Sequence, residues 1–247
     1  MRHMQWNPWH GCHKCSPGCA NCFVFYLDEK RNIDTEIVRK SKTNFNLPLK
    51  KDRSGNFKIP SNCEVATCFT SDFFIEEADE WRNDAWDIIR QRPDVLFLIC
   101  TKRIERFNLC IPDDWGDGWD NVAIAVTCEN QRKTDERMPV FLKIKAKHKY
   151  IFAAPILEEI DFSSYLSDEQ IEMISVGGES YANARPCDFD WVCKIKNTCD
   201  AYHVIFDFHQ TGSKFIKDGR YYKIHHHDEY SQAKKGEKYL KSISNLN

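Results

Sequence analysis

Short, nearly continuous apolar segments recur along the 247-residue chain. Runs of this length that are not broken by regular polar positions are typical of strands covered on both faces, as in a parallel sheet. The chain contains six of them: "EVATCF" (64–69), "DVLFLIC" (94–100), "NVAIAVTC" (121–128), "KYIFAAP" (149–155), "EMISVG" (172–177) and "HVIFDF" (203–208).

Segments with helical periodicity lie between these runs. The clearest is "IEEADEWRNDAWDIIRQR" (75–92), whose acidic first turn suits the helix dipole. Its apolar residues are expected on one face: Ala78, Trp81, Ala85, Ile88 and Ile89. Weaker helical patterns cover 131–147 and 188–202.

This alternation predicts an α/β fold of parallel βα repeats that close into a partial or full, TIM-like barrel. A doubly wound open sheet is the alternative architecture. The length permits one undivided domain, so we expect 1–247 to form a single unit. The basic, irregular segment at about 30–62 is predicted to be an insertion over the active face or, alternatively, a solvated surface loop.

Charge and hydropathy restrict the partners and the compartment. With 35 basic and 37 acidic residues the formal charge is -2, so any polyanion must meet a local patch. No apolar run approaches the roughly 20 residues that span a bilayer, and no signal-peptide pattern begins the chain, so we expect a cytoplasmic protein with no membrane partner. In a reducing compartment the scattered cysteines are expected in the core: Cys63, Cys68, Cys100, Cys110, Cys128, Cys187, Cys193 and Cys199.

Four further cysteines cluster in "GCHKCSPGCANCF" (11–23), at Cys12, Cys15, Cys19 and Cys22. Four-cysteine zinc sites normally have a longer insert between their two pairs, whereas here only three residues separate Cys15 from Cys19. The spacing therefore favours an iron–sulfur cubane over a structural zinc site.

The subset Cys15, Cys19 and Cys22 reads C-x3-C-x2-C, the spacing of radical S-adenosylmethionine enzymes. Three such cysteines hold a [4Fe-4S] cluster and leave one iron open to chelate S-adenosylmethionine, which the reduced cluster cleaves to a 5′-deoxyadenosyl radical.

Six ordered motifs extend this pattern over nearly the whole chain: "WNPWHGCHKCSPGCANC" (6–22), "CFTSDFF" (68–74), "TKRIERF" (101–107), "VTCENQRKTDERMP" (126–139), "VGGES" (176–180) with "ARP" after it, and "FHQTG" (208–212). Together they closely resemble the phage-associated three-Cys-motif family of radical-SAM-like proteins. The family's pattern, G-C-x-K-x-S-P-G-C-x-N-C, implies Cys12, Cys19 and Cys22 as ligands, with an apolar residue commonly at the position of Cys15. The two patterns agree on Cys19 and Cys22, and we favour Cys12 over Cys15 as the third ligand.

Residues just past strand ends converge on the mouth of a βα barrel, so the polar ones are candidate S-adenosylmethionine contacts. The candidates are Ser71, Asp72, Lys102, Glu129, Gly177, Gly178 and Glu179. Lys102 and Arg103 are suited to a carboxylate or phosphate, or alternatively to pairing with Glu129 or Glu179. Helix capping is the alternative for Ser71 and Asp72, and a tight turn is the alternative for the glycines.

The sequence thus predicts a radical SAM-type enzyme that needs a reductant and acts on an unknown substrate, with nucleic acid or a nucleotide as one candidate. A noncatalytic, metal-stabilised binding module that acts with a partner protein is the alternative. The three adjacent histidines of "IHHHDE" (224–229) cannot face one site and are expected at the surface. The tryptophans Trp6, Trp9, Trp115 and Trp119 are expected to anchor the core or loops.

Overall fold

The computed structural model describes residues 3–244. The chain divides into two compact units whose segments interleave along the sequence. Among the described residues, the first unit contains 3–15, 24–126 and 143–149, and the second contains 16–23, 127–142 and 150–244. The expectation of a single domain over 1–247 stays a prediction.

Parallel strands form the centre of the first unit. Their order is β1 (His3–Trp6), β4 (Glu64–Thr67), β5 (Leu96–Thr101) and β6 (Val122–Thr127). Every residue of β6 is buried, as expected for a strand covered on both faces. The three later strands coincide with predicted apolar runs, whereas β1 was not predicted because its four residues carry no apolar run.

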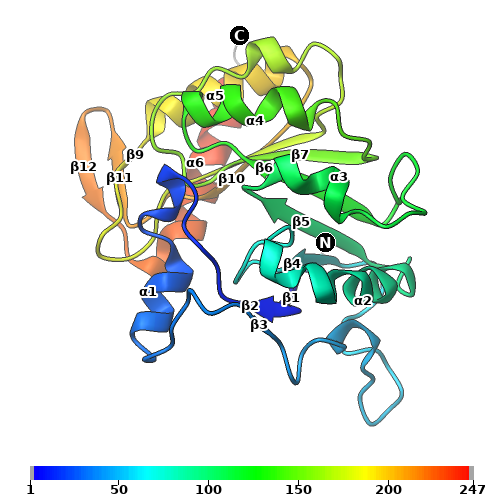
Figure 1. Cartoon of the computed structure of the whole chain (residues 1–247). Coiled ribbons are helices and arrows are strands. Elements are labelled where there is room, and N and C mark those ends of the chain that lie inside the picture. Colours follow the sequence, from blue (N-terminus) through cyan, green and yellow to red (C-terminus); the bar gives the residue numbers. More distant parts are fainter. Residues whose placement is uncertain (1–2, 245–247) are drawn as a thin grey trace. The chain divides into compact units, whose positions relative to one another are not determined.

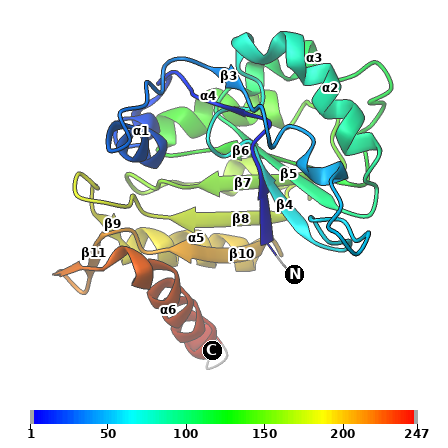
Figure 2. The same ribbon diagram turned by 90° about the horizontal axis from the view of Figure 1, so that it is seen from below.

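The second unit contains the parallel strands β8 (Met173–Gly177) and β10 (Ile205–Gln210) and, from residue 150 onward, β7 (His148–Ala153). The three lie side by side in Figure 2. These also match predicted runs. A smaller sheet joins β12 (Arg220–Lys223), β11 (Lys214–Lys217) and β9 (Cys187–Asp188) in that order.

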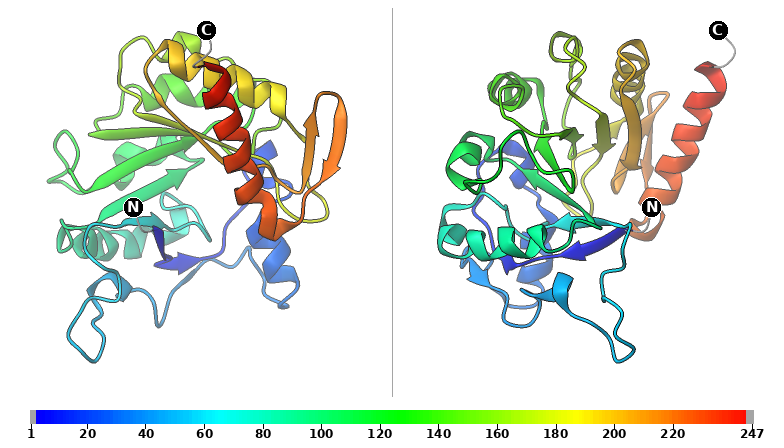
Figure 3. Two further views of the ribbon diagram at one scale, coloured as in Figure 1. Left: turned by 180° about the vertical axis from the view of Figure 1, so that it is seen from behind. Right: turned by 90° about the vertical axis from the view of Figure 1, so that its right-hand side faces the viewer.

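Helices separate the strands, as βα repeats require (Figure 1). They are α1 (Phe23–Glu29), α2 (Asp79–Arg90), α3 (Phe107–Cys110), α4 (Gln131–Phe141), α5 (Phe189–Ala201) and α6 (Glu229–Ser244). The side chain of Asn130 caps α4 and that of Asp188 caps α5, each accepting a backbone N–H of the first turn. In the second unit both α5 and α6 pack on β10, which Figure 3 shows from two further sides.

The predicted helix at 75–92 is confirmed as α2, but its buried face differs from the prediction. Trp81 is only half-buried, and Arg82 and Trp86 are buried beside Ala85, Ile88 and Ile89. Arg82 turns inward because its Nε donates to the carbonyl of Phe73 at 2.9 Å, which satisfies a buried backbone oxygen.

The irregular segment at 30–62 is tied to the first unit by hydrogen bonds. The Trp6 indole donates to the carbonyl of Phe45 at 2.9 Å, and Arg92 donates to the carbonyl of Ile59 at 2.9 Å. Phe45 and Ile59 are themselves buried. The segment also contributes β3 (Arg39–Lys40), which pairs with β2 (Trp9–His10). Its place over an active face stays a prediction.

The α/β class and the parallel βα repeats are confirmed, whereas closure of those repeats into a partial or full barrel stays a prediction. The predicted tryptophan anchors are also confirmed. Trp6, Trp9 and Trp115 are buried, and Trp119 contacts Trp115 with ring centroids 5.6 Å apart. Within residues 3–244, no helix combines the length and the apolar character needed to cross a membrane.

Candidate functional site

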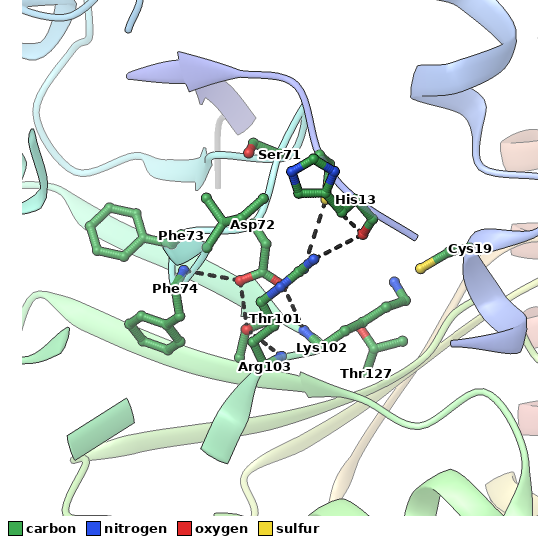
Figure 4. A network of polar contacts seen from close by, with 12 residues as sticks. His13, Cys19, Ser71, Asp72, Phe73, Phe74, Thr101, Lys102, Arg103 and Thr127 are labelled. Atoms are coloured by element: carbon green, nitrogen blue, oxygen red, sulfur yellow. Dashed lines mark hydrogen bonds and ion pairs between the residues drawn. The ribbon is translucent and has the colours of Figure 1, made fainter. Parts of the chain in front are cut away.

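Asp72, in the loop after β4, is the centre of a buried polar network in the first unit (Figure 4). Its Oδ1 accepts the Thr101 hydroxyl at 2.7 Å and the backbone N–H of Phe74 at 3.0 Å. Its Oδ2 accepts the backbone N–H of Lys102 at 2.9 Å and pairs with Arg103 Nη1 at 3.2 Å. The carboxylate therefore joins the loops that follow β4 and β5.

Arg103 extends this network to the first half of the cysteine loop. Its Nη2 donates to the carbonyl of His13 at 2.8 Å, and its Nη1 lies 3.8 Å from Cys12 Sγ. Burial by itself lowers the pKa of Arg103, but the negative charges of Asp72, Cys12 and Cys15 outweigh it and raise that pKa. The guanidinium is thus a fixed cation beside the thiol of Cys12.

Gly11 fixes the start of the cysteine loop. Its φ is +100°, and a Cβ there would meet the carbonyl oxygen of Ile37 at 2.5 Å, so only glycine fits. The Ser71 hydroxyl donates to the carbonyl of Gly11, and the N–H of Cys12 donates to the carbonyl of Thr35 at 2.8 Å. Ser71 and Asp72 do not cap the helical segments after them, whose N-cap residues are Ile75 and Ala78.

Glu129, which follows β6, holds the second half of the cysteine loop within the second unit. Its side chain is fully buried and pairs with Arg137 at 2.6 Å. The other carboxylate oxygen accepts the backbone N–H of Gly18 at 3.3 Å. Arg137 also donates to the carbonyl of Thr127 at 2.7 Å, so the pair is tied to the end of the strand.

Glu179, which follows β8, contacts the same half of the loop. It accepts Asn21 Nδ2 at 2.9 Å and Arg185 Nε at 3.0 Å, while Arg185 Nη2 donates to the carbonyl of Pro17 at 2.8 Å. Burial alone raises the pKa of Glu179, but the hydrogen bonds from Arg185 and Asn21 outweigh burial and lower it. The carboxylate is therefore held ionised.

The adjacent glycines Gly177 and Gly178 meet different surroundings. A Cβ on Gly178 would lie 2.4 Å from the carbonyl oxygen of Thr211 and 2.8 Å from Cys187 Cβ. A Cβ on Gly177 would lie 3.1 Å from Cγ of Gln210, a side-chain atom at a less severe distance. Close approach of the protein's own backbone thus accounts for Gly178.

The four clustered thiols differ in exposure. Cys19 is buried, Cys12 and Cys22 are half-buried, and Cys15 is exposed. No three His, Cys, Asp or Glu side chains are gathered as around a metal ion within residues 3–244. Thiolates are the usual ligands of iron–sulfur clusters, and a neighbouring cation favours the thiolate form, so the donor set and Arg103 suit such a group.

A buried hydroxyl near the loop also lacks a partner. Thr70 Oγ1 has no hydrogen-bond partner among the described residues, although the backbone carbonyl of Thr70 accepts the N–H of Gly11 at 3.2 Å. An unsatisfied buried donor costs about 1–3 kcal/mol, so this atom is available to a bound group. The surroundings of the loop therefore fit a ligand.

The remaining cysteines and the histidines agree with expectation for the most part. Six of the eight scattered cysteines are buried, and Cys100 and Cys193 are half-buried. Burial raises the pKa of the Cys199 thiol to about 12, so it stays neutral in the core. The three histidines of 224–229 are exposed, as predicted.

Sequence reasoning did not assign roles to Arg185, Arg137 and Asn21. Each stands inside or directly beside a motif that was recognised: "ARP", "VTCENQRKTDERMP" and the cysteine loop itself. A search for cations that match the carboxylates at strand ends would have found the two arginines.

The comparisons with known proteins give one result. The model of a family described as "Protein of unknown function (DUF5131)" matches residues 2–241. No curated protein matches, and no solved structure matches.

Proposed function

The chain belongs to the DUF5131 family, and we propose that it is a cytoplasmic radical SAM-type enzyme that binds a [4Fe-4S] cluster and S-adenosylmethionine. The placement of the cysteine loop is the observation that carries the proposal. In the first unit the loop is held by groups that follow β4 and β5, and in the second by groups that follow β6 and β8. In parallel βα proteins the ends of the strands are where cofactors bind.

Cys12, Cys19 and Cys22 would hold the cluster, with Cys15 as the alternative third ligand. When bound, such a cluster with one open iron supplies electron transfer to the sulfonium of S-adenosylmethionine, and an external reductant must renew it. The choice of Cys12 is supported by Arg103, whose Nη1 lies 3.8 Å from its sulfur.

The seven residues predicted to contact S-adenosylmethionine have different environments in the protein, and we assign them different roles. Asp72 and Glu179 each accept four hydrogen bonds from protein donors, and Glu129 is fully buried in its ion pair, so we assign all three the role of positioning the loop. Gly178 is explained by backbone packing. Ser71, Lys102 and Gly177 remain the proposed cofactor contacts, and the hydroxyl of Thr70 joins them.

The resemblance to the phage-associated family makes a nucleic acid or nucleotide one candidate substrate. The chain's formal charge of -2 means that a local basic surface would have to recognise it.

The deciding experiment measures iron, sulfide and cofactor cleavage in anaerobically purified and reconstituted protein. We expect about four irons per chain and release of methionine from S-adenosylmethionine after reduction. Cys12→Ala, Cys19→Ala and Cys22→Ala should each lose the cluster, whereas the matched Cys15→Ala should retain it.

Two outcomes would change the proposal. If Cys12→Ala retains the cluster and Cys15→Ala loses it, the third ligand is Cys15 and not Cys12. Colourless protein with one zinc per chain, even after reconstitution with iron and sulfide, would refute the enzyme proposal and favour the alternative, a metal-stabilised binding module.

A further inference from the structure

The hairpin formed by β11 and β12 presents an exposed edge strand in the second unit. The strands pair antiparallel and are joined by Asp218 and Gly219, whose φ values of 52° and 67° are those of a tight hairpin turn. Because β11 pairs with β9 on its other side, β12 is the edge, and all four of its residues are exposed. The hairpin stands out at the margin of this unit in Figures 1 and 3.

One face of the hairpin is anchored in the core. Phe215 is buried, with its ring centroid 5.7 Å from that of Phe189. Lys217 lies on the same face, with its Nζ 4.4 Å from the centre of the Tyr239 ring. Since side chains alternate between the faces of a strand, Lys214 and Ile216 of β11 belong to the opposite face, together with their cross-strand partners Lys223 and Tyr221.

The hairpin places like charges directly opposite each other. Lys214 faces Lys223, and Lys217 faces Arg220. Such cross-strand pairs are destabilising, and Asp218 is the single acidic residue in 214–223. None of the four cations forms an ion pair with a carboxylate in the part of the chain that the structure describes. The repulsion is therefore left for an external anion to relieve.

An aromatic side chain lies on the same face as the first of these pairs. Tyr221 is 49% exposed, although an aromatic side chain gains stability from burial. Two cations and an exposed aromatic ring on one face form the combination that binds single-stranded nucleic acid, because lysines contact phosphates and the ring stacks on an unpaired base. A lipid surface would favour several exposed apolar side chains, whereas Ile216 is the one aliphatic residue here and is half-buried.

We propose that the outer face of the β11–β12 hairpin binds single-stranded nucleic acid, with phosphates at Lys214 and Lys223 and a base stacked on Tyr221. This surface gives a protein of formal charge -2 the local basic patch that a polyanion requires. The proposal does not depend on the iron–sulfur cluster.

Fluorescence anisotropy of the full-length protein tests the phosphate contacts. The probe is a labelled single strand of about 20 nucleotides, which is longer than the roughly 4–16 nucleotides that one OB-fold module covers. In Lys214→Ala/Lys223→Ala, the slope of log K against log salt should become shallower by about 1.4, or about 0.7 for each lost contact. The matched control, Lys235→Ala/Lys238→Ala on α6, removes the same charge from two exposed lysines outside the hairpin and should keep the wild-type slope.

The stacking contact has its own pair of variants. Tyr221→Ala should weaken binding between about 5- and 150-fold, the range for loss of one stacked base, while Tyr221→Phe keeps the ring and should bind like wild type. Circular dichroism confirms that each variant is folded. Cys19→Ala/Cys22→Ala should also bind like wild type, which separates this proposal from that of the cluster.

Three outcomes would overturn the proposal. The first is unchanged binding by the hairpin variants. The second is an equal change in salt slope in the α6 control and in Lys214→Ala/Lys223→Ala. The third is preference for a duplex of the same sequence or for phosphatidylserine vesicles over the single strand.

Discussion

Replacement of Gly178 by alanine distinguishes a glycine that serves packing from one that serves a cofactor. The new Cβ would lie 2.4 Å from the carbonyl oxygen of Thr211, where ordinary contact begins at 3.4 Å. The backbone at Thr211 is itself held, because its N–H donates to the carbonyl of Glu229 at 3.2 Å. The backbone at residue 178 and the backbone at Thr211 would therefore have to move apart by about 1 Å, and the hydrogen bonds that hold these two segments oppose that movement.

The expected cost is about 2–3 kcal/mol, in the upper part of the range for overpacking. For a chain of this length that corresponds to a fall in Tm of about 4–12 °C. Gly177→Ala is the matched control, because its nearest obstacle is a side-chain atom, Gln210 Cγ at 3.1 Å, which has to yield by only about 0.3 Å. It should cost no more than about 1 kcal/mol.

Urea and thermal unfolding of cofactor-free protein, followed by circular dichroism, measure both variants against wild type. A Gly178→Ala protein as stable as wild type, or equal destabilisation of the two alanine variants, would refute backbone packing as the role of Gly178. A stable Gly178→Ala protein that no longer binds S-adenosylmethionine would show that this glycine makes room for the cofactor instead.

Two further predictions concern buried ionisable groups. Asp72→Asn leaves the Arg103 guanidinium, which is 12% exposed, without its carboxylate partner. Urea unfolding should show a loss of about 3 kcal/mol in the free energy of unfolding. The control Asp87→Asn, at an exposed position, should stay within about 0.5 kcal/mol of wild type. Burial raises the pKa of Cys199 to about 12, whereas the pKa of this thiol in the unfolded chain is about 8.5. The contribution of the neutral thiol to the free energy of unfolding is therefore complete below about pH 8.5 and is lost as pH rises toward 12. Between pH 7.5 and 10 wild type should therefore lose about 2 kcal/mol more than Cys199→Ala, and equal losses in the two proteins would contradict this.

The sequence predicted the elements whose signal is local. All six apolar runs became parallel strands. Burial along the whole strand, as expected for a strand covered on both faces, is seen in β6, whereas buried and less buried residues alternate in β7 and β10. Strand β1 was missed because it carries no such run. The inward turn of Arg82 was missed for a different reason: its partners are the carbonyls of Phe73 and Ile75, and a helical wheel treats arginine only as polar.

The site was predictable as a set of positions but not as a set of contacts. The rule that side chains past strand ends converge found Asp72, Glu129 and Glu179, and all three contact the cysteine loop or its arginine anchors. Their partners were not predictable, because Gly18 and Glu129 stand 111 positions apart. Spacing along the chain says nothing about such pairs.

The three strand-end carboxylates share an arrangement that bears on the metal site proposed above. Each pairs with an arginine, and the loop backbone then binds to one member of each pair: His13 to Arg103, Gly18 to Glu129, and Pro17 to Arg185. A loop held by the protein's own groups does not need a metal to order it. Structural zinc sites behave in the opposite way, since the metal supplies the folding free energy. The anchoring of the Cys12–Cys22 loop therefore supports the proposal of a group bound for its chemistry over the alternative of one bound for stability.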